Sequence, residues 1–310
     1  MSVYSAVTRT QLEQFVNQYP LGKVIAYEGI EDGIDNTNYF VTTTQGEFVL
    51  TLFESLSADK LPYYLNLLCF LGENNLPCPN PYLNNQARSF GSLNHKQAAV
   101  FKRFPGRSAI TPSIAQCHEI GLHLGRLHRL TENHVFPINS NHDLRWCKSV
   151  FNKIDSHLTS SDRSLISDEM NFLSTVYTDN LPKGVIHGDL FKDNALFIDD
   201  RLTGLLDFYS AGTGILSLDI AITVNDWCYG SGEINLKKLF ALLTGYESIR
   251  QLEQSEKQIW PSLLRAAALR FWLSRLQHQL FPPTSKLTQY KDPSVFRQLL
   301  QQYRQRPITL

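Results

Sequence analysis

The chain of 310 residues has no excess of charge of either sign and no long apolar run. Lys plus Arg and Asp plus Glu number 29 each, so no overall field attracts nucleic acid or an anionic membrane surface. Nowhere do about eighteen apolar residues follow one another, and residues 1–5 contain no basic region leading into an apolar core. We therefore expect no nucleic-acid partner, no membrane span and no export signal.

Cysteine is also scarce, and its spacing excludes two common uses. The five cysteines form no Cys-x-x-Cys pair, and their odd number argues against a disulfide framework. His118, His123, His128 and His134 are spaced so that successive side chains point in different directions around a helix, which favours packing or surface roles over a metal site. A reducing, cytoplasmic location fits this composition best.

What the sequence does contain is a large apolar fraction, 43% of residues, whose period changes along the chain. In the first third, a helical stripe over residues 10–19 and a second helical segment over 58–74 are accompanied by runs of β type. These β-type runs lie at residues 24–27, 39–43, 48–53 and 98–101. They predict a small antiparallel sheet.

From about residue 106 onward the period is mainly helical. The predicted helices cover residues 113–131, two segments of 142–181 divided near 160–162, and then 217–228, 233–247, 259–280 and 293–303. We therefore predict an α+β protein of two lobes. Residues 1–105 would form the small sheet lobe and residues 106–310 the larger helical lobe, with a hinge near 102–106.

One stretch of the second lobe carries a chemical signature. A polar loop from His187 to Asn194 follows a short apolar run, and a predicted hairpin then leads to Asp207. Phosphoryl transfer from ATP requires a carboxylate beside the acceptor hydroxyl and oxygen ligands that hold Mg²⁺ against the phosphates. Asp189 fits the first role, and Asn194 and Asp207 fit the second. Asp and Asn are also common in turns, but their order and strand context favour the catalytic interpretation.

These residues give the chain a resemblance to a known family. The sequence of residues 187–194, His-Gly-Asp-Leu-Phe-Lys-Asp-Asn, together with residues 206–209 and 219–228, resembles the protein-kinase-like phosphotransferases, the superfamily of aminoglycoside and choline kinases, and within it the bacterial homoserine kinases. Residues 36–41 and 269–276 extend the resemblance over most of the chain. It implies a protein-kinase-like two-lobed fold, ATP and L-homoserine as substrates, Mg²⁺ as cofactor and a role in threonine biosynthesis.

The resemblance implies that a loop of the sheet lobe covers the nucleotide. This loop contains Gly33 and is followed by Asn36, Thr37 and Asn38, and its glycines would let backbone N–H groups approach phosphate. Nearby acidic residues oppose that contact, and an ordinary β-turn explains the loop about as well.

The cation that many members of the superfamily use for the α- and β-phosphates is missing. Thr51 stands at the corresponding position, so either Lys60, at the start of the next helix, or Mg²⁺ and backbone donors would take its place. The connector containing Lys102 and Phe104 would meet adenine through its backbone. Lys102 and Arg103 are equally explained as surface charges.

A zwitterionic acceptor requires at least one cation and one anion in its pocket. Arg270 and Arg275 fall on the two edges of the apolar stripe of the long C-terminal helix, from which a guanidinium can bind a carboxylate as a planar fork. An internal salt bridge is the alternative for both. Asp35, Asn225 or Asp226 would accept a hydrogen bond from the ammonium group. A choline-type acceptor would instead require an aromatic cage, for which Tyr209, Trp227, Tyr229 and Trp272 are candidates.

The remaining polar residues of this region are expected to support the loop. We predict that His187 anchors it through a hydrogen bond rather than transferring a proton. Asp193 would help the metal shell or cap the local turn. Asp219 would brace the loop's backbone, and Asp226, seven residues later on the same helix face, would then point toward the same cleft; the alternative is that both are solvated helix acids.

Two competing functions remain open at this point. One is a kinase of the same superfamily with another small acceptor, such as choline, methylthioribose or an aminoglycoside. The other is a catalytically silent ATP-binding regulator, suggested by Thr51 in place of a cation. A protein kinase is disfavoured because no Ala-Pro-Glu sequence follows Asp207.

Overall fold

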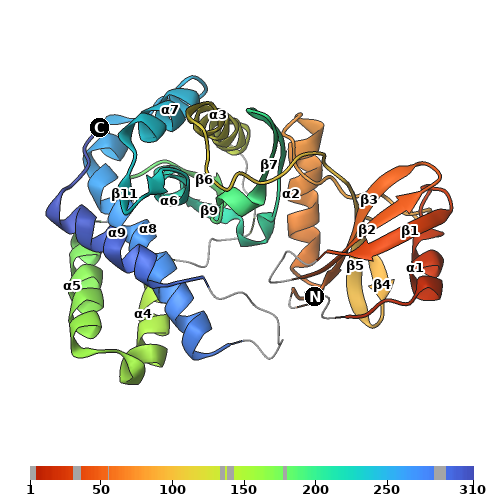
Figure 1. Cartoon of the computed structure of the whole chain (residues 1–310), viewed down its shortest axis with the longest axis horizontal. Coiled ribbons are helices and arrows are strands. Elements are labelled where there is room, and N and C mark those ends of the chain that lie inside the picture. Colours follow the sequence, from red (N-terminus) through yellow and green to blue (C-terminus); the bar gives the residue numbers. More distant parts are fainter. Residues whose placement is uncertain are drawn as a thin grey trace. The chain divides into compact units, whose positions relative to one another are not determined.

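The computed structural model describes residues 5–30, 36–54, 56–132, 137, 143–176, 180–282 and 291–310. The chain divides into two compact units, and the division falls between Pro105 and Gly106 (Figure 1). We call them the sheet unit, described from residue 5 to residue 105, and the helical unit, described over residues 106–282 and 291–310. Each is considered by itself below.

The sheet unit is built on a five-stranded antiparallel sheet with the strand order β1-β2-β3-β5-β4. The strands are β1 (Val24–Gly29), β2 (Asn36–Thr43), β3 (Gly46–Phe53), β4 (Gly91–Leu93) and β5 (Lys96–Lys102). Side chains alternate between the two faces of a strand, so Tyr39 and Val41 of β2 share one face with Leu50 and Leu52 of β3. That face packs against Leu12, Phe15 and Val16 of α1 (Arg9–Val16) in the core of this unit.

Three details of the sheet unit differ from the predictions. Helix α1 ends at Val16 rather than Tyr19, although Tyr19 is still buried in the core. Helix α2 (Leu61–Glu73) begins three residues later than predicted, because Pro62 fits the first turn, where its missing N–H is not needed. The short strand β4 was not predicted, since it contains Gly and Ser and is only three residues long.

The helical unit contains seven α-helices among its described residues. They are α3 (Ile114–Thr131), α4 (Leu144–Ile154), α5 (Ser160–Val176), α6 (Leu216–Trp227), α7 (Leu236–Glu247), α8 (Gln254–Leu280) and α9 (Ser294–Gln305). Helix α8 packs against α4, α5, α6 and α9, as Figure 1 shows for the blue and green helices. The core therefore forms around α8.

Short strands and 3₁₀ turns carry the chain through the middle of this unit. The strand pairs are β6 (Lys183–Ile186) with β9 (Gly212–Ile215), β7 (Ala195–Ile198) with β8 (Arg201–Leu205), and β10 (Tyr229–Gly230) with β11 (Glu233–Ile234). The 3₁₀ turns are η1 (Asp155–His157), η2 (Lys192–Asn194) and η3 (Phe208–Ser210). Turns η2 and η3 fall in the stretch with the phosphotransferase signature.

The residues at which the helices begin are set more by local capping than by the spacing of apolar residues. Ser113 caps α3 in a capping box with Gln116, as its position before the first helical residue predicts. Helix α8 begins at Gln254 rather than at 259, because Glu253 and Glu256 form a second capping box. Helix α7 begins at Leu236 rather than at 233, since β10 and β11 occupy the preceding residues.

Helices α3 and α7 lie side by side (Figure 1) and are in unusually close contact. A Cβ atom added at Gly121 of α3 would clash with the Leu242 carbonyl oxygen of α7. One added at Gly245 of α7 would clash with the His118 carbonyl oxygen of α3. The two backbones touch because neither position carries a side chain.

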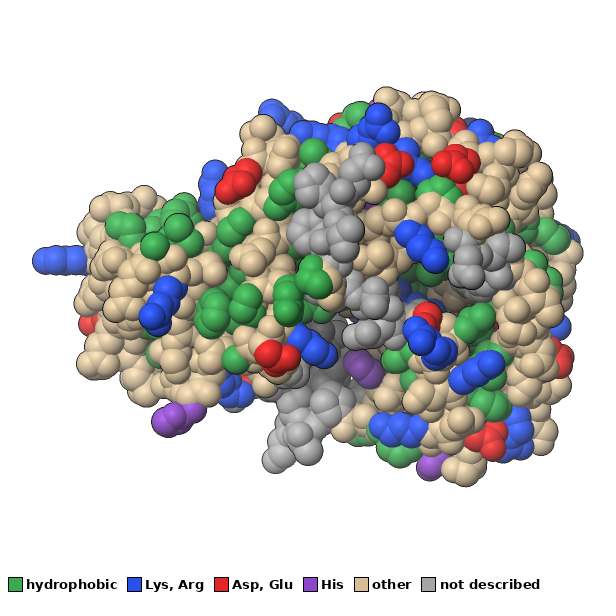
Figure 2. Space-filling model, turned by 180° about the vertical axis from the view of Figure 1, so that it is seen from behind, with side chains coloured by type: hydrophobic (Ala, Val, Ile, Leu, Met, Phe, Trp, Pro, Cys, Tyr) green, Lys and Arg blue, Asp and Glu red, His purple; other side chains and the backbone are tan. Residues whose placement is uncertain are grey.

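Two observations bear on the expectations drawn from the overall charge and hydropathy. No described helix has both the length and the apolar character needed to cross a bilayer. Figure 2 shows Lys and Arg interspersed with Asp and Glu on the face it presents, as the equal numbers of the two kinds predict.

Candidate active site

The loop from His187 to Asn194 begins where β6 ends, and a buried carboxylate holds its start. Asp219 of α6 accepts hydrogen bonds from the backbone N–H groups of His187, at 2.7 Å, and of Gly188, at 2.8 Å. Its side chain is fully buried. Burial disfavours the charged form, but the hydrogen bonds from His128 and from the Gly188 N–H keep the pKa of Asp219 below its ordinary value. The loop is thus braced by an ionised carboxylate, as predicted.

His187 connects this loop to the segment that carries Asp207. Its Nε2–H donates to the Leu206 carbonyl oxygen at 2.9 Å, and its Nδ1 accepts from the Asp189 N–H at 3.3 Å. Burial lowers its pKa, so the ring is neutral. Both ring nitrogens are therefore used inside the protein. These contacts give His187 an anchoring role and leave neither ring nitrogen for proton transfer to a substrate.

The three residues with the predicted catalytic and metal-binding roles converge. The Asn194 side-chain Nδ2 donates to the Asp189 carbonyl oxygen, at 2.8 Å, and to the Asp189 carboxylate, at 3.3 Å. The Leu206 N–H donates to the Asn194 carbonyl oxygen at 2.8 Å, which brings the end of β8 beside the loop. The next residue, Asp207, has a left-handed backbone with φ of 59°, a conformation that Asp tolerates better than most residues.

The electrostatics of this group favour a bound cation. Burial and the neighbouring charge of Asp207 raise the pKa of Asp189 to about 8. Because Nδ2 of Asn194 is committed to Asp189, its Oδ1 is the end available as a ligand. Among the described residues, no three His, Cys, Asp or Glu side chains gather as a complete protein metal site. The pair of Asn194 and Asp207 fits Mg²⁺, which commonly takes one or two protein oxygens and completes its shell with phosphates and water.

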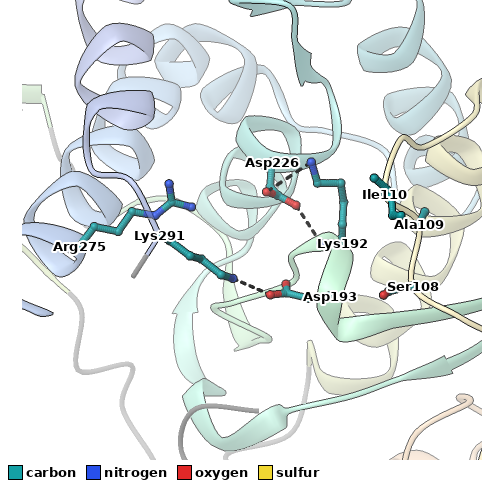
Figure 3. Close-up of a pocket in the computed structure, with 8 residues that line it drawn as sticks. All are labelled: Ser108, Ala109, Ile110, Lys192, Asp193, Asp226, Arg275 and Lys291. Carbon is teal, nitrogen blue, oxygen red and sulfur yellow. Dashed lines mark hydrogen bonds and ion pairs between the residues drawn. The ribbon is translucent and has the colours of Figure 1, made fainter. Parts of the chain in front are cut away.

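A pocket of ≈ 270 Å³ lies beside the loop (Figure 3). It is lined by Ser108, Ala109, Ile110, Lys192, Asp193, Asp226, Arg275 and Lys291. Figure 3 shows these charged side chains in two pairs, with the Arg275 guanidinium beside them. Lys291 Nζ lies 2.5 Å from the Asp193 carboxylate, and Lys192 Nζ lies 3.9 Å from that of Asp226. The pocket therefore presents both signs of charge to a small ligand.

Two of the pocket residues are positioned by backbone contacts. The Lys192 N–H donates to the Asp226 carboxylate at 2.8 Å, so α6 fixes the turn η2 as well as the start of the loop. Arg275 donates through Nη1 to the Asp292 carbonyl oxygen at 2.8 Å, and its guanidinium lies over the ring of Phe296. Burial lowers the pKa of Arg275, yet an arginine remains protonated at neutral pH.

Three acceptor-binding predictions do not coincide with this pocket. Asn225 is buried, with Nδ2 donating to the Leu264 carbonyl oxygen and Oδ1 accepting from the Tyr303 hydroxyl, so its amide holds helices together. Arg270 is buried and does not line the pocket, although its charge acts on Asp189. Tyr209 lies in η3 and also is not a lining residue. The prediction for Asn225 is wrong, because its position on α6 faces the core.

The sequence reasoning did not single out the lysines of the pocket. Lys192 belongs to the signature loop but received no role, and Lys291 lies far from it in the sequence. The spacing of Asp219 and Asp226 pointed to this cleft, but no local pattern marks Lys291, which only the fold brings to Asp193. Asp193, predicted to aid the metal shell or cap its turn, forms this ion pair at the pocket.

The predicted nucleotide residues of the sheet unit lie on different faces of one sheet. Asn38 and Thr51 are paired across β2 and β3, and the Thr51 hydroxyl donates to the Asn38 Oδ1 at 2.7 Å. Thr37 points to the opposite, core face, where its buried hydroxyl accepts from the Ser5 N–H and donates to Glu54. The prediction that Thr37 contacts the nucleotide directly is therefore wrong.

The other predicted nucleotide residues are less constrained. Asn36 accepts from the Glu54 N–H through Oδ1, Lys60 is exposed just before α2, and Lys102 is the last residue of β5, two residues before Phe104. Gly33 and Asp35 lie outside the described residues. Arg103 was considered a surface charge, but its guanidinium lies over the ring of Phe40, which shares a strand face with Asn38. Arg103 thus brings a cation to the face of Asn38 and Thr51.

Comparison with known proteins shows where this geometry belongs. Residues 26–252, which include β2, β3, the catalytic loop and α6, match the phosphotransferase enzyme family. The chain belongs to this family. It is similar, at 40% identity over 301 residues, to a homoserine kinase of Methylobacillus flagellatus, with 97% of this chain and 94% of the relative covered. A homoserine kinase of Janthinobacterium sp. (strain Marseille) is 38% identical over 308 residues, with 97% and 95% covered.

Solved structures of other phosphotransferases share the fold. A microcompartment-associated aminopropanol kinase superimposes with a TM-score of 0.76 at 16% identity, covering 96% of this chain and 97% of that one. The amicoumacin kinase hAmiN, solved with AMP-PNP and Ca²⁺, gives a TM-score of 0.71 at 16% identity, covering 98% and 95%. The predicted protein-kinase-like fold, with a small antiparallel-sheet lobe and a larger helical lobe, is confirmed.

Proposed function

We propose that this phosphotransferase transfers the γ-phosphoryl group of ATP to the side-chain hydroxyl of L-homoserine, forming O-phospho-L-homoserine and ADP for threonine biosynthesis. One observation carries the proposal: relatives named homoserine kinase match nearly the whole chain, including the loop in which Asn194 binds both the backbone and the carboxylate of Asp189. A cytoplasmic location is part of the proposal, supported by five cysteines that are all free thiols.

In this proposal Asp189 orients the acceptor. Its carboxylate accepts a hydrogen bond from the homoserine hydroxyl, whose oxygen attacks the γ-phosphorus as the bond from that phosphorus to the ADP oxygen breaks. The hydroxyl proton passes to Asp189 late, after the leaving bond has loosened. Asn194 holds the Asp189 carboxylate in one orientation through its Nδ2. Most of the rate enhancement then comes from positioning.

Asn194 and Asp207 would hold Mg²⁺, which would supply positive charge against the negative charge that develops on the phosphates during transfer. The chain's own contribution is to keep the two ligands in place. Turn η2 fixes Asn194, and the hydrogen bond from the Leu206 N–H to the Asn194 carbonyl oxygen fixes the residue before Asp207.

The charged pocket would bind the amino-acid part of the acceptor. L-Homoserine carries a carboxylate and an ammonium, and Arg275 offers a planar fork of donors to the carboxylate, with Lys291 as a second cation. Asp226, whose carboxylate already accepts from the Lys192 N–H, would accept from the ammonium. An aromatic cage for a quaternary ammonium is not found among the described residues that line this pocket.

The nucleotide would contact the sheet unit through the face that carries Asn38 and Thr51. Both are uncharged, and the guanidinium of Arg103, which is paired with Glu47, lies over Phe40 of the same strand face. We therefore propose that Arg103, rather than Lys60, replaces the missing strand cation, together with Mg²⁺ and backbone donors.

The test is ADP release from Mg-ATP with a panel of acceptors. The panel contains L-homoserine, D-homoserine, L-serine, choline, methylthioribose and kanamycin. The proposal predicts ADP release with L-homoserine and much less with D-homoserine, whose configuration would not fit the pocket. Activity with choline, methylthioribose or kanamycin instead would overturn the acceptor assignment while retaining the phosphotransferase chemistry, and ATP binding without any turnover would favour a silent regulator.

A variant separates chemistry from binding. Asp189→Ala should lower kcat by roughly 10³-fold, the range of a lost general base, while the affinity for Mg-ATP stays nearly the same. The exposed acid Asp168 of α5 supplies the matched control, Asp168→Ala, which should behave like the natural protein. Loss of nucleotide binding in Asp189→Ala would contradict the orienting role.

A further inference from the structure

A chain of buried polar side chains runs from the start of α8 to the catalytic loop. Its members are Glu256, Arg250, Tyr246, His128 and Asp219, and none is more than 5% exposed. Three of them, Glu256, Arg250 and Asp219, have acidic or basic side chains, and none of the five lines the pocket beside the catalytic loop. A buried polar network of this length is costly unless every donor and acceptor is used.

The distances connect all five residues. Arg250 Nη1 lies 3.2 and 3.0 Å from the two carboxylate oxygens of Glu256 and 3.2 Å from the Tyr246 hydroxyl oxygen. That hydroxyl lies 2.8 Å from Nδ1 of His128, and Nε2 of His128 lies 3.1 Å from Oδ2 of Asp219. Asp219 in turn accepts from the loop's two N–H groups.

The chemistry of these groups fixes the direction of every hydrogen bond. Arginine has donors and no acceptor, so the Tyr246 oxygen must accept from Arg250. Burial raises the pKa of Tyr246, so the phenol keeps its proton. That proton is then donated to Nδ1 of His128, and the hydrogen of a neutral ring must sit on Nε2, where it points to Asp219.

The opposite protonation of His128 does not fit. A ring protonated on Nδ1, whether neutral or charged, would donate to the Tyr246 oxygen, which already accepts from Arg250. The phenol proton would then lack an acceptor among the contacts of the described residues. A buried donor without an acceptor is destabilising, which selects the first arrangement.

We propose that Arg250 and Tyr246 are positioning residues that hold His128 as the Nε2–H tautomer, and so keep the Asp219 carboxylate ionised and aimed at the catalytic loop. The capping box of Glu253 and Glu256 anchors the far end, because the Glu253 N–H donates to Glu256 at 3.0 Å. The close contact of α3 and α7 at Gly121 and Gly245 holds His128 and Tyr246 within reach of one another. The inference deepens the proposed kinase function and rests on it for its catalytic consequence.

The direct test is ¹⁵N NMR of the intact protein labelled in its histidine rings. The His128 signal, assigned by its absence in His128→Gln, should show a neutral ring protonated on Nε2. In Tyr246→Phe the donor to Nδ1 is lost, and the signal should change to a mixture of tautomers or to a protonated ring. A natural protein with Nδ1–H, or a Tyr246→Phe spectrum identical to the natural one, would overturn the proposal.

Kinetics supply the second measurement. Tyr246→Phe should lower kcat roughly tenfold, the effect of about one lost hydrogen bond, with KM for both substrates changed by less than about twofold. Tyr19→Phe is the matched control, because the Tyr19 hydroxyl is also buried but has no hydrogen-bond partner among the described atoms. It should leave kcat and the His128 signal unchanged.

The outcomes separate this proposal from the proposed function. If the natural protein does not phosphorylate homoserine, the NMR signal still reports the tautomer, and kcat is measured with the acceptor that the panel identifies. A changed tautomer with unchanged kcat would overturn the positioning role. A loss of kcat that only follows a lowered unfolding temperature, with the tautomer unchanged, would also overturn it.

Discussion

The two units bury polar side chains of different kinds. In the described part of the sheet unit the buried polar residues are neutral: Thr37, Thr43, Thr51 and Asn84. Every buried histidine, acidic or basic side chain among the described residues belongs to the helical unit: His123, His128, Glu169, His187, Asp219, Arg250, Glu256 and Arg270. The sheet unit uses the hydroxyls of Thr37, Thr43 and Thr51 in hydrogen bonds, whereas the helical unit holds the start of its catalytic loop through the buried carboxylate of Asp219.

This difference shows which part of the fold depends on electrostatics. A hydroxyl left without its partner loses about one hydrogen bond, but a buried charge left without its partner loses several kcal/mol. The catalytic loop therefore has a fixed position, but it is more sensitive to substitution of the residues that hold it. Four substitutions test this contrast.

Asp219→Ala should have the largest effect. It removes the acceptor for the N–H groups of His187 and Gly188 and for His128, so we expect a loss of about 5 kcal/mol in the free energy of unfolding and no measurable turnover. Urea unfolding followed by fluorescence measures the first, and ADP release the second. A loss below about 1 kcal/mol, the value for a solvated helix acid, would contradict the comparison.

Glu169→Ala breaks a buried pair outside the catalytic loop. Arg265 donates to both oxygens of Glu169, at 2.8 and 2.7 Å, and would be left unpaired, so we expect a loss of about 3 to 4 kcal/mol. The double variant Glu169→Met, Arg265→Leu should recover most of that stability, because no charge is then left alone. Equal losses in the single and double variants would show that packing, not charge, matters there.

His123 makes the helical unit sensitive to acid. Burial lowers its pKa to about 4, Glu119 partly opposes this, and the charge of Arg126 adds to it. Above pH ~6.5 the ring is neutral in both states; as the pH falls toward 4 the unfolded chain binds the proton first, so stability falls by on the order of 3 kcal/mol. His123→Gln should flatten this part of the curve of unfolding free energy against pH. The exposed His157, changed to Gln, should leave the slope as it is.

Thr51→Val should have the smallest effect. It removes one hydroxyl bond to Asn38, so we expect a loss of about 1 kcal/mol in unfolding free energy and a modest rise in KM for ATP. Thr37→Val is the matched change on the core face and should affect stability without affecting KM for ATP. Equal effects of the two variants on KM for ATP would contradict a specific role of Thr51 at the nucleotide.

The parts of the fold and site that could be predicted are those encoded within short stretches. The strands β2 and β3 follow from their alternating residues, and the convergence of Asp189, Asn194 and Asp207 follows from one contiguous loop and hairpin. Residues that meet through packing gave no local signal: Lys291 and Arg275 reach the pocket from segments far from Asp193 in the sequence.

Some of the errors had a signal that was available. Thr37 alternates with Tyr39 and Val41, both apolar, and this alone places it on the core face away from Asn38. The capping box of Glu253 and Glu256 was visible as an acid pair three residues apart, and would have moved the start of α8. The role of His128 was not visible, because its partners Tyr246 and Asp219 lie more than ninety residues away, at separations of 118 and 91 residues.

The contact between α3 and α7 limits how this sequence can diverge. Gly121 and Gly245 accept no side chain while the two backbones touch, so a relative with alanine at either position must move one helix outward. Such a relative would have to replace the pair of His128 and Tyr246 with longer side chains, or leave its Asp219 without them. Substitutions at these four positions should therefore be inherited together, even though the glycines do not line the pocket beside the catalytic loop.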